Sequence, residues 1–413
     1  MKTADILEVT LLQSVYGGDC LARLSDGRAM FVPYGLPGEV VRVEVLEEKR
    51  SFVRARLLEV LKPAAERITA RCPHFGVCGG CYYQHMPYEM QLRTKETVVR
   101  EQLMRIAGVE DAPLKTIVPS PQPWLYRNSV QFHLAEDGRL GFQANQSHRV
   151  VPVEVCYLPA AALNETWPRF DFEALPGLER IEFRQGDDED VLVLLEGEPT
   201  DLPEVEVEMS LSLVHHSAVG EILLAGNDFT QISVLGKTFI VSATSFFQVN
   251  TAQAEKLVAY VLEQVQPDKH KTVLDVYCGV GLFSAFIAEK AGECIAIELS
   301  PSACRDFAEN LDAFENVSLY EGAAEDVLPA LEIKADVVLV DPPRAGLDVK
   351  ALDAIVTTGA QCIVYVSCDP STLARDIKRL SKAGYQLQSV QPFDLFPQTY
   401  HVETVVLMSR AGL

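Results

Sequence analysis

The sequence predicts an α/β protein whose C-terminal part is a doubly wound, mostly parallel sheet. Three observations support this fold class and a division of the chain into several domains. From about Thr244, continuous apolar runs alternate with helical patterns, as expected for parallel strands buried on both faces. The chain has 413 residues, more than one hydrophobic core usually serves, so two to four domains are expected. Residues 5–62 instead show short strand patterns separated by glycine turns.

The composition is that of an ordinary globular protein, with 48% hydrophobic and 23% charged residues. No segment approaches the roughly eighteen uninterrupted apolar residues of a membrane span. Residues 1–10 lack the basic start and apolar run of a signal peptide. These features predict a cytoplasmic protein with no membrane partner, and we expect it to be a monomer.

The net charge of −22 at first argues against a nucleic-acid partner, which requires local positive charge. The charge is unevenly distributed, however. Residues 171–208 hold fourteen acids and two basic residues, whereas residues 42–149 hold sixteen Lys and Arg and twelve acids. The sequence therefore allows a basic face on an acidic protein, although a solvated mixture of charges fits these counts equally well.

Residues 1–62 are predicted to form a small β-barrel. Strand patterns bounded by glycine turns cover residues 8–15, 27–33, 39–47 and 52–61. Barrels of this oligonucleotide-binding type often bind RNA, while a purely structural barrel is the alternative. Residues 63–240 follow as a second, mostly β part. It contains a helical pattern at 88–106 and strand patterns at 129–134 and 191–196.

This second part begins with a compact cysteine-rich knot. Three of the ten cysteines in the chain lie close together, at Cys72, Cys78 and Cys81. Outside oxidising compartments, such cysteines are more often metal ligands or catalysts than disulfides. A tetrahedral zinc ion and a [4Fe–4S] cluster each take four thiolates, and spacing alone does not separate the two.

Residues 241–413 contain a nucleotide-type turn. The strand pattern at 273–277 leads into Gly279 and Gly281, which allow a nucleotide to approach the backbone closely. No third glycine follows at the dinucleotide spacing, which favours S-adenosylmethionine over NAD. Glu298 ends the next strand, nineteen residues beyond Gly279, where an acid can accept hydrogen bonds from both ribose hydroxyls.

Two further strand ends should reach the same edge of the sheet. Asp341 follows the strand pattern at 337–340, and Cys368 follows the one at 363–366. An isolated cysteine is usually a buried structural residue. This one precedes a helix that begins near Ser371, whose N-terminus would favour a thiolate, so a nucleophile is the better interpretation.

A thiolate beside a bound methyl donor suits methylation at carbon 5 of uracil. That carbon is a poor nucleophile until a thiolate adds to carbon 6. A general base must then remove the carbon 5 proton so that the thiolate can leave. Glu403, which opens the last strand pattern at 404–408, is the candidate base, although such an acid is more often a plain surface residue.

With these residues assembled, the chain resembles the RNA (uracil-5-)-methyltransferase family, and within it the iron–sulfur branch that acts on 23S rRNA. The matching stretches occur in the family's order, at Cys72–Cys81 with Cys156, 126–128, 246–250, 275–281, 341–346, 367–370 and 396–403. The resemblance implies a TRAM domain, an OB-like RNA-binding barrel, at 1–62 and a central RNA-binding domain at 63–240. It also implies a Rossmann-like class I methyltransferase domain at 241–413.

The resemblance further implies roles for individual residues. Cys368 would be the nucleophile and Glu403 the proton acceptor. The residues that would bind S-adenosylmethionine are Gln248, Tyr277, Glu298 and Asp341. The resemblance favours a [4Fe–4S] cluster over zinc at Cys72, Cys78, Cys81 and Cys156. Leu282 departs from the family, which commonly has Asn there, so one hydrogen bond to the cofactor is missing or supplied elsewhere.

Methylation of carbon 5 of a specific uridine in 23S rRNA is the preferred prediction, and three alternatives remain. An RNA cytosine-5 methyltransferase shares the thiolate chemistry but generally has Pro-Cys or Thr-Cys, not Ser367-Cys368. A tRNA uridine methyltransferase differs only in its target; its bacterial branch usually lacks the knot and the barrel, while its archaeal branch can have the knot. An inactive iron–sulfur RNA-binding protein is the third, supported only by Leu282 and the acidity.

Overall fold

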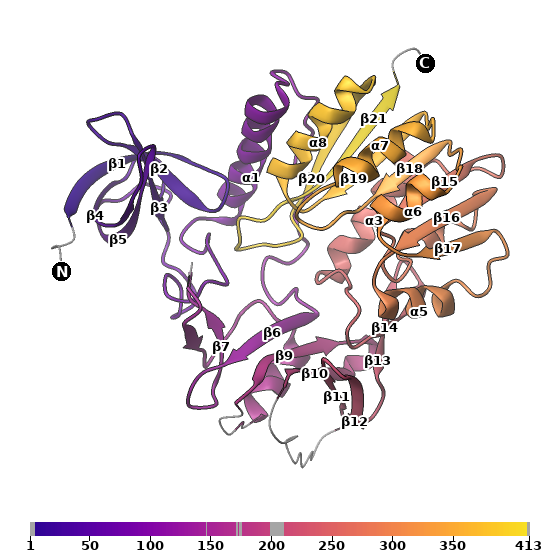
Figure 1. Ribbon diagram of the computed structural model, residues 1–413. Coiled ribbons are helices and arrows are strands. Elements are labelled where there is room, and N and C mark those ends of the chain that lie inside the picture. Colours follow the sequence, from indigo (N-terminus) through magenta and orange to yellow (C-terminus); the bar gives the residue numbers. More distant parts are fainter. Residues whose placement is uncertain (1–4, 146, 171, 173–175, 199–209, 411–413) are drawn as a thin grey trace.

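The computed structural model describes residues 5–145, 147–170, 172, 176–198 and 210–410. Figure 1 shows a small barrel, a second sheet and a larger sheet flanked by helices. The described range contains no helix that is both long and apolar enough to span a membrane.

The N-terminal barrel is closed, and its strands follow the order β1-β2-β3-β5-β4. The strands are β1 (Ile6–Ser14), β2 (Asp19–Arg23), β3 (Ala29–Pro33), β4 (Val40–Glu48) and β5 (Phe52–Lys62). Four of them match the predicted barrel strands to within two residues. The prediction missed β2, because five residues with an acid at one end and a base at the other show no clear alternation. Its Cys20 and Ala22 nevertheless point into the barrel core.

No helix or strand is assigned between residues 63 and 87. Helix α1 (Tyr88–Gln102) and one π-helical turn, η1 (Leu103–Ala107), follow, close to the predicted helix at 88–106. This helix packs against the C-terminal sheet domain and runs beside α8 (Pro370–Lys382) in Figure 1. Lys95 Nζ lies 2.6 Å from Asp394 Oδ1, and both side chains are fully buried. A segment predicted to belong to the central part is therefore anchored to the C-terminal part.

The central sheet has seven strands in the order β12-β11-β10-β9-β6-β7-β8. The predicted strands at 129–134 and 191–196 are confirmed as β6 and β10. The strands are β6 (Ser129–Leu134), β7 (Leu140–Gln143), β8 (Val150–Pro152), β9 (Leu178–Gln185), β10 (Val191–Gly197), β11 (Ser212–Ser217) and β12 (Gly220–Ala225). The short helices are α2 (Ala161–Thr166), η2 (Trp167–Arg169) and η3 (Asp187–Glu189). Phe132, Trp167 and Phe183 form the centre of its core.

The C-terminal sheet has the order β17-β16-β15-β18-β19-β21-β20. Its strands are β15 (Thr272–Val276), β16 (Glu293–Glu298), β17 (Val317–Glu321), β18 (Val337–Val340), β19 (Cys362–Ser367), β20 (Tyr385–Phe393) and β21 (Glu403–Arg410). The helices are α3 (Thr251–Val265), α4 (Ser284–Ile287), α5 (Pro301–Asn310), α6 (Ala324–Ala330), α7 (Val349–Thr357) and α8. The first five strands are parallel, which confirms the doubly wound sheet. β20 and β21 are antiparallel to their neighbours and were not predicted to be so.

A hairpin of β13 (Phe229–Val234) and β14 (Lys237–Ser242) precedes α3. Its Ile232 and Phe239 belong to the core on one face of the C-terminal sheet. Val99 and Leu103 of the α1–η1 segment belong to the core on the other face. The packing therefore crosses the limit at residue 240, and the division into 1–62, 63–240 and 241–413 stays a prediction.

Candidate active site at the carboxyl edge of the sheet

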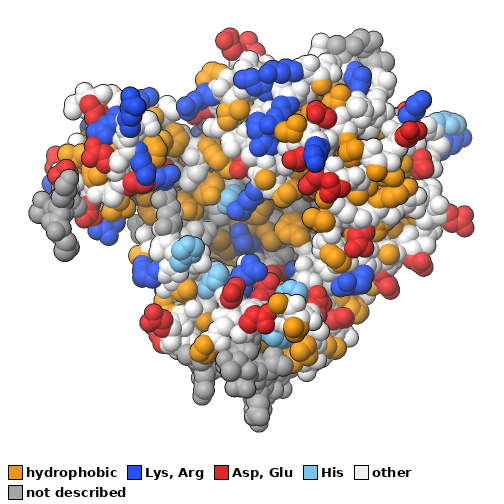
Figure 2. Space-filling model, in the orientation of Figure 1, with side chains coloured by type: hydrophobic (Ala, Val, Ile, Leu, Met, Phe, Trp, Pro, Cys, Tyr) orange, Lys and Arg blue, Asp and Glu red, His pale blue; other side chains and the backbone are white. Residues whose placement is uncertain are grey.

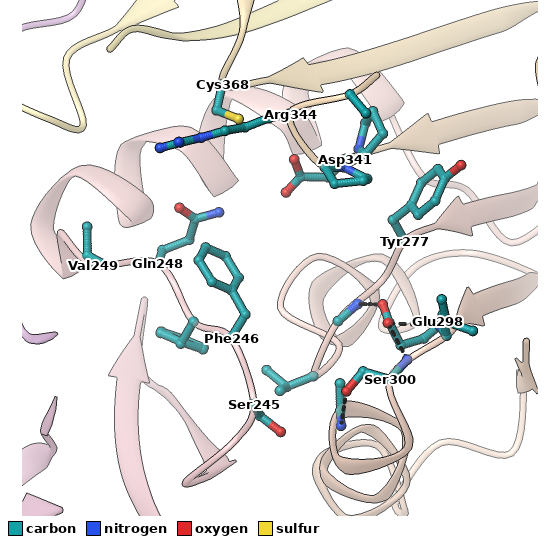
Figure 3. Close-up of a pocket in the computed structure, with 18 of the residues that line it drawn as sticks. Ser245, Phe246, Gln248, Val249, Tyr277, Glu298, Ser300, Asp341, Arg344 and Cys368 are labelled. Atoms are coloured by element: carbon teal, nitrogen blue, oxygen red, sulfur yellow. Dashed lines mark hydrogen bonds between the residues drawn. The ribbon is translucent and has the colours of Figure 1, made fainter. Parts of the chain in front are cut away.

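Neighbouring strands of the C-terminal sheet end at one cavity of about 1520 Å³ (Figure 3). Six of the residues singled out in the sequence line it: Gln248, Tyr277, Glu298, Asp341, Cys368 and Glu403. Tyr277, Asp341 and Cys368 follow the parallel strands β15, β18 and β19, whose carboxyl ends lie at the same edge.

Glu403 reaches this edge for a different reason. Strand β21 is antiparallel to β19, and Ser367 pairs with Thr404. The first residue of β21 therefore lies beside the residue that follows β19, which is Cys368. The register of one strand pair brings together two residues that are 35 positions apart in the sequence.

The loop after β15 has the backbone shape of a nucleotide cradle. Tyr277 adopts a left-handed conformation with φ 67°, which is strained for a residue with a side chain. Gly279 has φ 55°, and a Cβ built there would meet nothing within 4 Å, so the turn is open towards the cavity. Gly281 has φ 90°, and a Cβ there would lie 2.4 Å from Leu311 Cδ1. The first glycine leaves room for a ligand, and the second permits close packing of the loop.

Glu298 is fixed at the end of β16 by backbone N–H groups. Gly279 donates a 2.9 Å hydrogen bond to one carboxylate oxygen, and Leu299 and Ser300 each donate a 2.8 Å bond to the other. A carboxylate has about four acceptor positions, so this arrangement leaves room for about one further donor. Glu298 lines the cavity with about one acceptor position free, and its role in binding a ribose stays a prediction.

The remaining predicted cofactor residues line the wall of the cavity. Gln248 is buried, and its backbone carbonyl accepts a 2.9 Å hydrogen bond from Asn128 Nδ2. Leu282 also lines the cavity and packs into the core with Phe283. Where the family commonly has a hydrogen-bonding Asn, this chain therefore offers an apolar contact. The open glycine turn, the fixed acid and this apolar wall together fit a nucleoside such as that of S-adenosylmethionine.

The environment of Cys368 does not favour a thiolate, contrary to the expectation from the helix N-terminus. Burial raises the pKa of the thiol to about 12, and the negative charges of Glu403 and Asp341 add to this effect, while Arg344 opposes it. The reason lies in the next residue. Asp369 Oδ1 accepts hydrogen bonds from the N–H groups of Ser371 and Thr372, so an acid rather than the thiol caps helix α8.

Two carboxyl groups share the floor of the site. Burial raises the pKa of Asp341 to about 7, and the charge of Asp275 adds to the shift. Burial and the charge of Asp341 also raise the pKa of Glu403 well above its usual range. Glu403 Oε1 is buried and has no hydrogen-bond partner among the described residues. A buried, unpartnered carboxyl that holds its proton tightly is a strong base once it is ionised.

Sequence reasoning missed two residues of this cavity. Arg344 extends alongside Cys368 in Figure 3 and forms no ion pair with a carboxylate in the described part of the chain. Phe246 is 70% exposed, and an aromatic face open to a cavity can stack on a nucleic-acid base. Both belong to stretches that carry the family resemblance, so their position beside assigned residues was the available signal.

The cavity opens onto a hollowed face with Lys, Arg and His side chains inside (Figure 2). The arginines that line the cavity are Arg127, Arg180, Arg184, Arg344, Arg375 and Arg379. Acidic side chains line the same cavity, namely Glu182, Glu196, Glu298, Glu325, Asp341, Asp348 and Glu403. Arg180 forms an ion pair with Glu196, and Arg184 forms one with Glu182. The cavity therefore carries charges of both signs, and the basic face that the sequence allowed stays a prediction.

The predicted metal site at the four cysteines is not confirmed. No group of three or more His, Cys, Asp or Glu residues that would hold a metal ion is found in the described ranges. The four thiols are free. Burial raises the pKa of Cys81 to about 12, and the charges of Cys156 and Cys78 add to it; burial raises that of Cys156 to about 11, with contributions from Cys78 and Cys72. Gly79 and Gly80, between two of these cysteines, line the active-site cavity.

Comparison with known proteins identifies the family of the chain. The model of the tRNA (uracil-5-)-methyltransferase family matches residues 200–411, and that of the TRAM domain matches residues 3–58. A crystal structure of the Pyrococcus abyssi tRNA (uracil-54, C5)-methyltransferase in complex with S-adenosyl-L-homocysteine is similar in fold. It has a TM-score of 0.75 and 24% sequence identity, and the match covers 97% of this chain and 100% of that one.

Relatives with closer sequences extend over nearly the whole chain. A protein of Streptomyces avermitilis named as an uncharacterized RNA methyltransferase is 36% identical over 427 residues, covering 98% of each chain. One of Halalkalibacterium halodurans with the same description is 33% identical over 444 residues, covering 98% of this chain and 97% of the relative. The chain therefore belongs to the tRNA (uracil-5-)-methyltransferase family of S-adenosylmethionine-dependent RNA methyltransferases.

Proposed function

We propose that the protein methylates carbon 5 of a specific uridine in 23S rRNA. The observation that carries this proposal is the pairing of β19 with β21, which sets Cys368 beside Glu403 in the cavity that the nucleotide-type loop also lines. A nucleophile and a general base at one edge are what carbon 5 methylation needs, whereas methylation of a nitrogen or of a hydroxyl needs no thiolate.

Gln248, Tyr277, Glu298 and Asp341 would hold S-adenosylmethionine, with Glu298 accepting a hydrogen bond from a ribose hydroxyl. When bound, this cofactor supplies an electrophilic methyl group on a positively charged sulfur. Held by these residues, its positive charge would favour the ionised forms of Asp341 and Glu403. The two acids whose pKa values are raised in the free protein would thus lose protons as the site fills.

The reaction begins when the uridine is turned out of its stack into the cavity. The Cys368 thiol gives its proton to water in the open cavity, with the Arg344 guanidinium favouring the anion. The sulfur then forms a bond to carbon 6, and the electrons of the C5–C6 double bond move towards oxygen 4. Carbon 5 becomes electron-rich and would take the methyl group, while the bond from that methyl group to the donor sulfur would break and release S-adenosylhomocysteine.

Glu403 completes the cycle as the proton acceptor. Its carboxylate removes the proton from the now tetrahedral carbon 5, and the released electron pair restores the C5–C6 double bond. The bond between carbon 6 and the sulfur breaks, and Cys368 leaves as a thiolate. The position of Glu403 at the first residue of β21, buried and without a hydrogen-bond partner among the described residues, suits an acid that must act as a base away from water.

The substrate of the proposed reaction is 23S rRNA because of the resemblance to the iron–sulfur rRNA branch. A tRNA target is the second candidate, favoured by the likeness in fold to the Pyrococcus abyssi tRNA enzyme. The test is to incubate the purified protein and methyl-labelled S-adenosylmethionine with unmodified transcripts of 23S rRNA or of tRNA, and to map 5-methyluridine in each. Label in 23S rRNA alone is expected; label in tRNA alone would transfer the proposal to the second candidate.

We further propose that Cys72, Cys78, Cys81 and Cys156 hold a [4Fe–4S] cluster. Four free thiols within electrostatic reach of one another support it, together with the resemblance. Because the proposed reaction needs no electron, the cluster would stabilise the segment that lines the cavity. Protein purified without oxygen should be brown and contain about four irons per chain. A colourless protein with one zinc ion would contradict the proposal.

A further inference from the structure

The first turn of the N-terminal barrel reaches the loop that carries the proposed nucleophile. Tyr16 lies between β1 and β2, and its hydroxyl donates a hydrogen bond to Asp369 Oδ2, across 353 positions in the sequence. Asp369 directly follows Cys368. A part of the protein that resembles an RNA-binding module therefore contacts the neighbour of the sulfur that would attack the base.

Asp369 depends on this contact for one of its two oxygens. Oδ1 accepts hydrogen bonds from Ser371 N at 2.8 Å, Ser371 Oγ at 2.7 Å and Thr372 N at 3.0 Å. These bonds fix one oxygen to the start of α8. At Oδ2, the hydroxyl of Tyr16 is the side-chain donor in the described part of the chain. Helix and barrel together therefore fix the orientation of the carboxyl group.

The barrel turn is held against the C-terminal part by close aromatic packing. The rings of Tyr16 and Tyr400 meet edge to face, with centroids 6.0 Å apart. Gly18 has φ 87°, and a Cβ there would lie 2.6 Å from Tyr82 Cδ1 and 3.0 Å from Tyr400 Cδ1. A side chain at residue 18 would push the turn away from both rings. The turn thus sits at a fixed distance from the catalytic loop.

We propose that Tyr16 is a positioning residue, which orients the Cys368 loop through Asp369 and makes productive chemistry depend on the docked barrel. The inference rests on the proposed function of Cys368 as the nucleophile. Tyr16 does not line the cavity, so it acts through its neighbour rather than on the base.

The charges around the sulfur give the contact a measurable consequence. Three negatively charged groups act on the Cys368 thiol, those of Glu403, Asp341 and Asp369. The positively charged guanidinium of Arg344 opposes them. The Tyr16 hydroxyl donates to Asp369 Oδ2, and its dipole partly offsets the negative charge of that carboxylate. Without that hydroxyl, more negative charge stays near the thiol, which then ionises at a higher pH.

The experiment compares the full-length protein with its Tyr16→Phe variant, which keeps the ring and loses the hydroxyl. Methylation of 23S rRNA and tRNA transcripts gives kcat and KM, and a kcat about tenfold lower with KM for RNA within twofold is expected. Without RNA, the rate at which iodoacetamide alkylates Cys368 is followed against pH by mass spectrometry of its peptide. The alkylation profile of the variant should move to higher pH. Tyr260→Phe, which removes a hydroxyl that accepts a bond from Lys115, is the matched control and should behave as wild type.

Unchanged kcat and an unchanged alkylation profile in Tyr16→Phe would overturn the inference. A rise confined to KM would also overturn it, because Tyr16 would then contact RNA.

Gly18→Ala should reproduce the loss of kcat by displacing the turn while keeping the hydroxyl. Activity retained in Cys368→Ala would overturn the proposed function itself. An inactive Cys368→Ala beside a wild-type Tyr16→Phe would leave that function intact and reject only the positioning role, and the alkylation profile decides even if neither transcript is methylated.

Discussion

The active-site cavity and the cysteine segment between residues 63 and 87 are held in different ways. In the cavity, hydrogen-bonded strands of one sheet set the positions of Asp341, Cys368 and Glu403. In the cysteine segment, no helix or strand is assigned, and the thiols are carried by turns and isolated bridges. A site built on strand ends is in place before its ligand binds, whereas a site built on turns gains its final geometry from what it binds.

The largest effect should come from removing the nucleophile, since the proposed addition to carbon 6 needs its thiolate. Cys368→Ala is expected to lower turnover by about a thousandfold or more, while binding of the 23S rRNA transcript changes only slightly. Filter binding and methyl transfer measured on the same preparation check this. Cys362→Ala, at the opposite end of β19, is the control for loss of a thiol from the same strand. If both variants kept activity, a pre-formed site at the strand ends would not be the source of catalysis.

Removing the proposed base should stop the reaction at a later stage. Glu403→Gln keeps the size of the side chain but cannot accept the carbon 5 proton, so turnover should fall by about a hundredfold or more. The enzyme should accumulate as a covalent complex with methylated RNA, because the sulfur cannot leave. A slower-migrating band in a denaturing gel reports this complex, and its absence from Cys368→Ala is the control. Normal turnover in Glu403→Gln would mean that another group accepts the carbon 5 proton.

The cysteine segment should respond to metal removal, and the sheet site should not. Each of Cys72→Ser, Cys78→Ser and Cys81→Ser should lose iron and lower the melting temperature by several degrees, because a ligand set contributes to folding. Cys304→Ser, at a buried cysteine outside the segment, serves as the control and should retain iron. Equal iron content in all four variants would show that the cysteine segment does not hold the metal.

The smallest effect concerns the buried carboxyls. The folded-state pKa of Asp341 is about 7, raised from an ordinary 3.8, so its contribution to stability is present below about pH 4 and lost as pH rises through 7. An Asn at this position does not ionise, so the stability of the Asp341→Asn variant does not fall as the pH rises through 7. Asp341→Asn should therefore raise the melting temperature by about 2 °C or more at pH 8, with no gain at pH 4. Thermal unfolding without cofactor measures this. Methylation should fall in the same variant, so a gain in activity would contradict the assigned role.

Much of the C-terminal fold and its site could be predicted because apolar runs mark buried strands and the residue after each run marks the edge. That rule located Asp341 and Cys368. It could not predict that β21 runs antiparallel, although the family motif identified Glu403. The sequence did contain a signal that Asp369 caps α8, namely an acid followed by Pro370 and Ser371. The prediction that the helix N-terminus favours a thiolate at Cys368 did not take this signal into account.

Other features have no local signal. The contact between Tyr16 and Asp369 joins residues 353 positions apart, and nothing near either residue indicates the other. The raised pKa of Cys368 depends first on burial and then on the acids that surround it, neither of which a one-dimensional pattern shows. The arrangement of the four cysteines also has no local signal, because their spacing suggests a ligand set but does not give its geometry.

The buried pair of Lys95 and Asp394 limits how the protein can be divided. A shortened chain that began at residue 241 would retain the acid and lose its cation, together with the helix that covers α8. Leaving one member of a buried pair alone costs about 3–5 kcal/mol, a large part of the stability of a typical domain. Efforts to express the catalytic half by itself should therefore begin upstream of Tyr88, or replace Asp394 with a neutral residue.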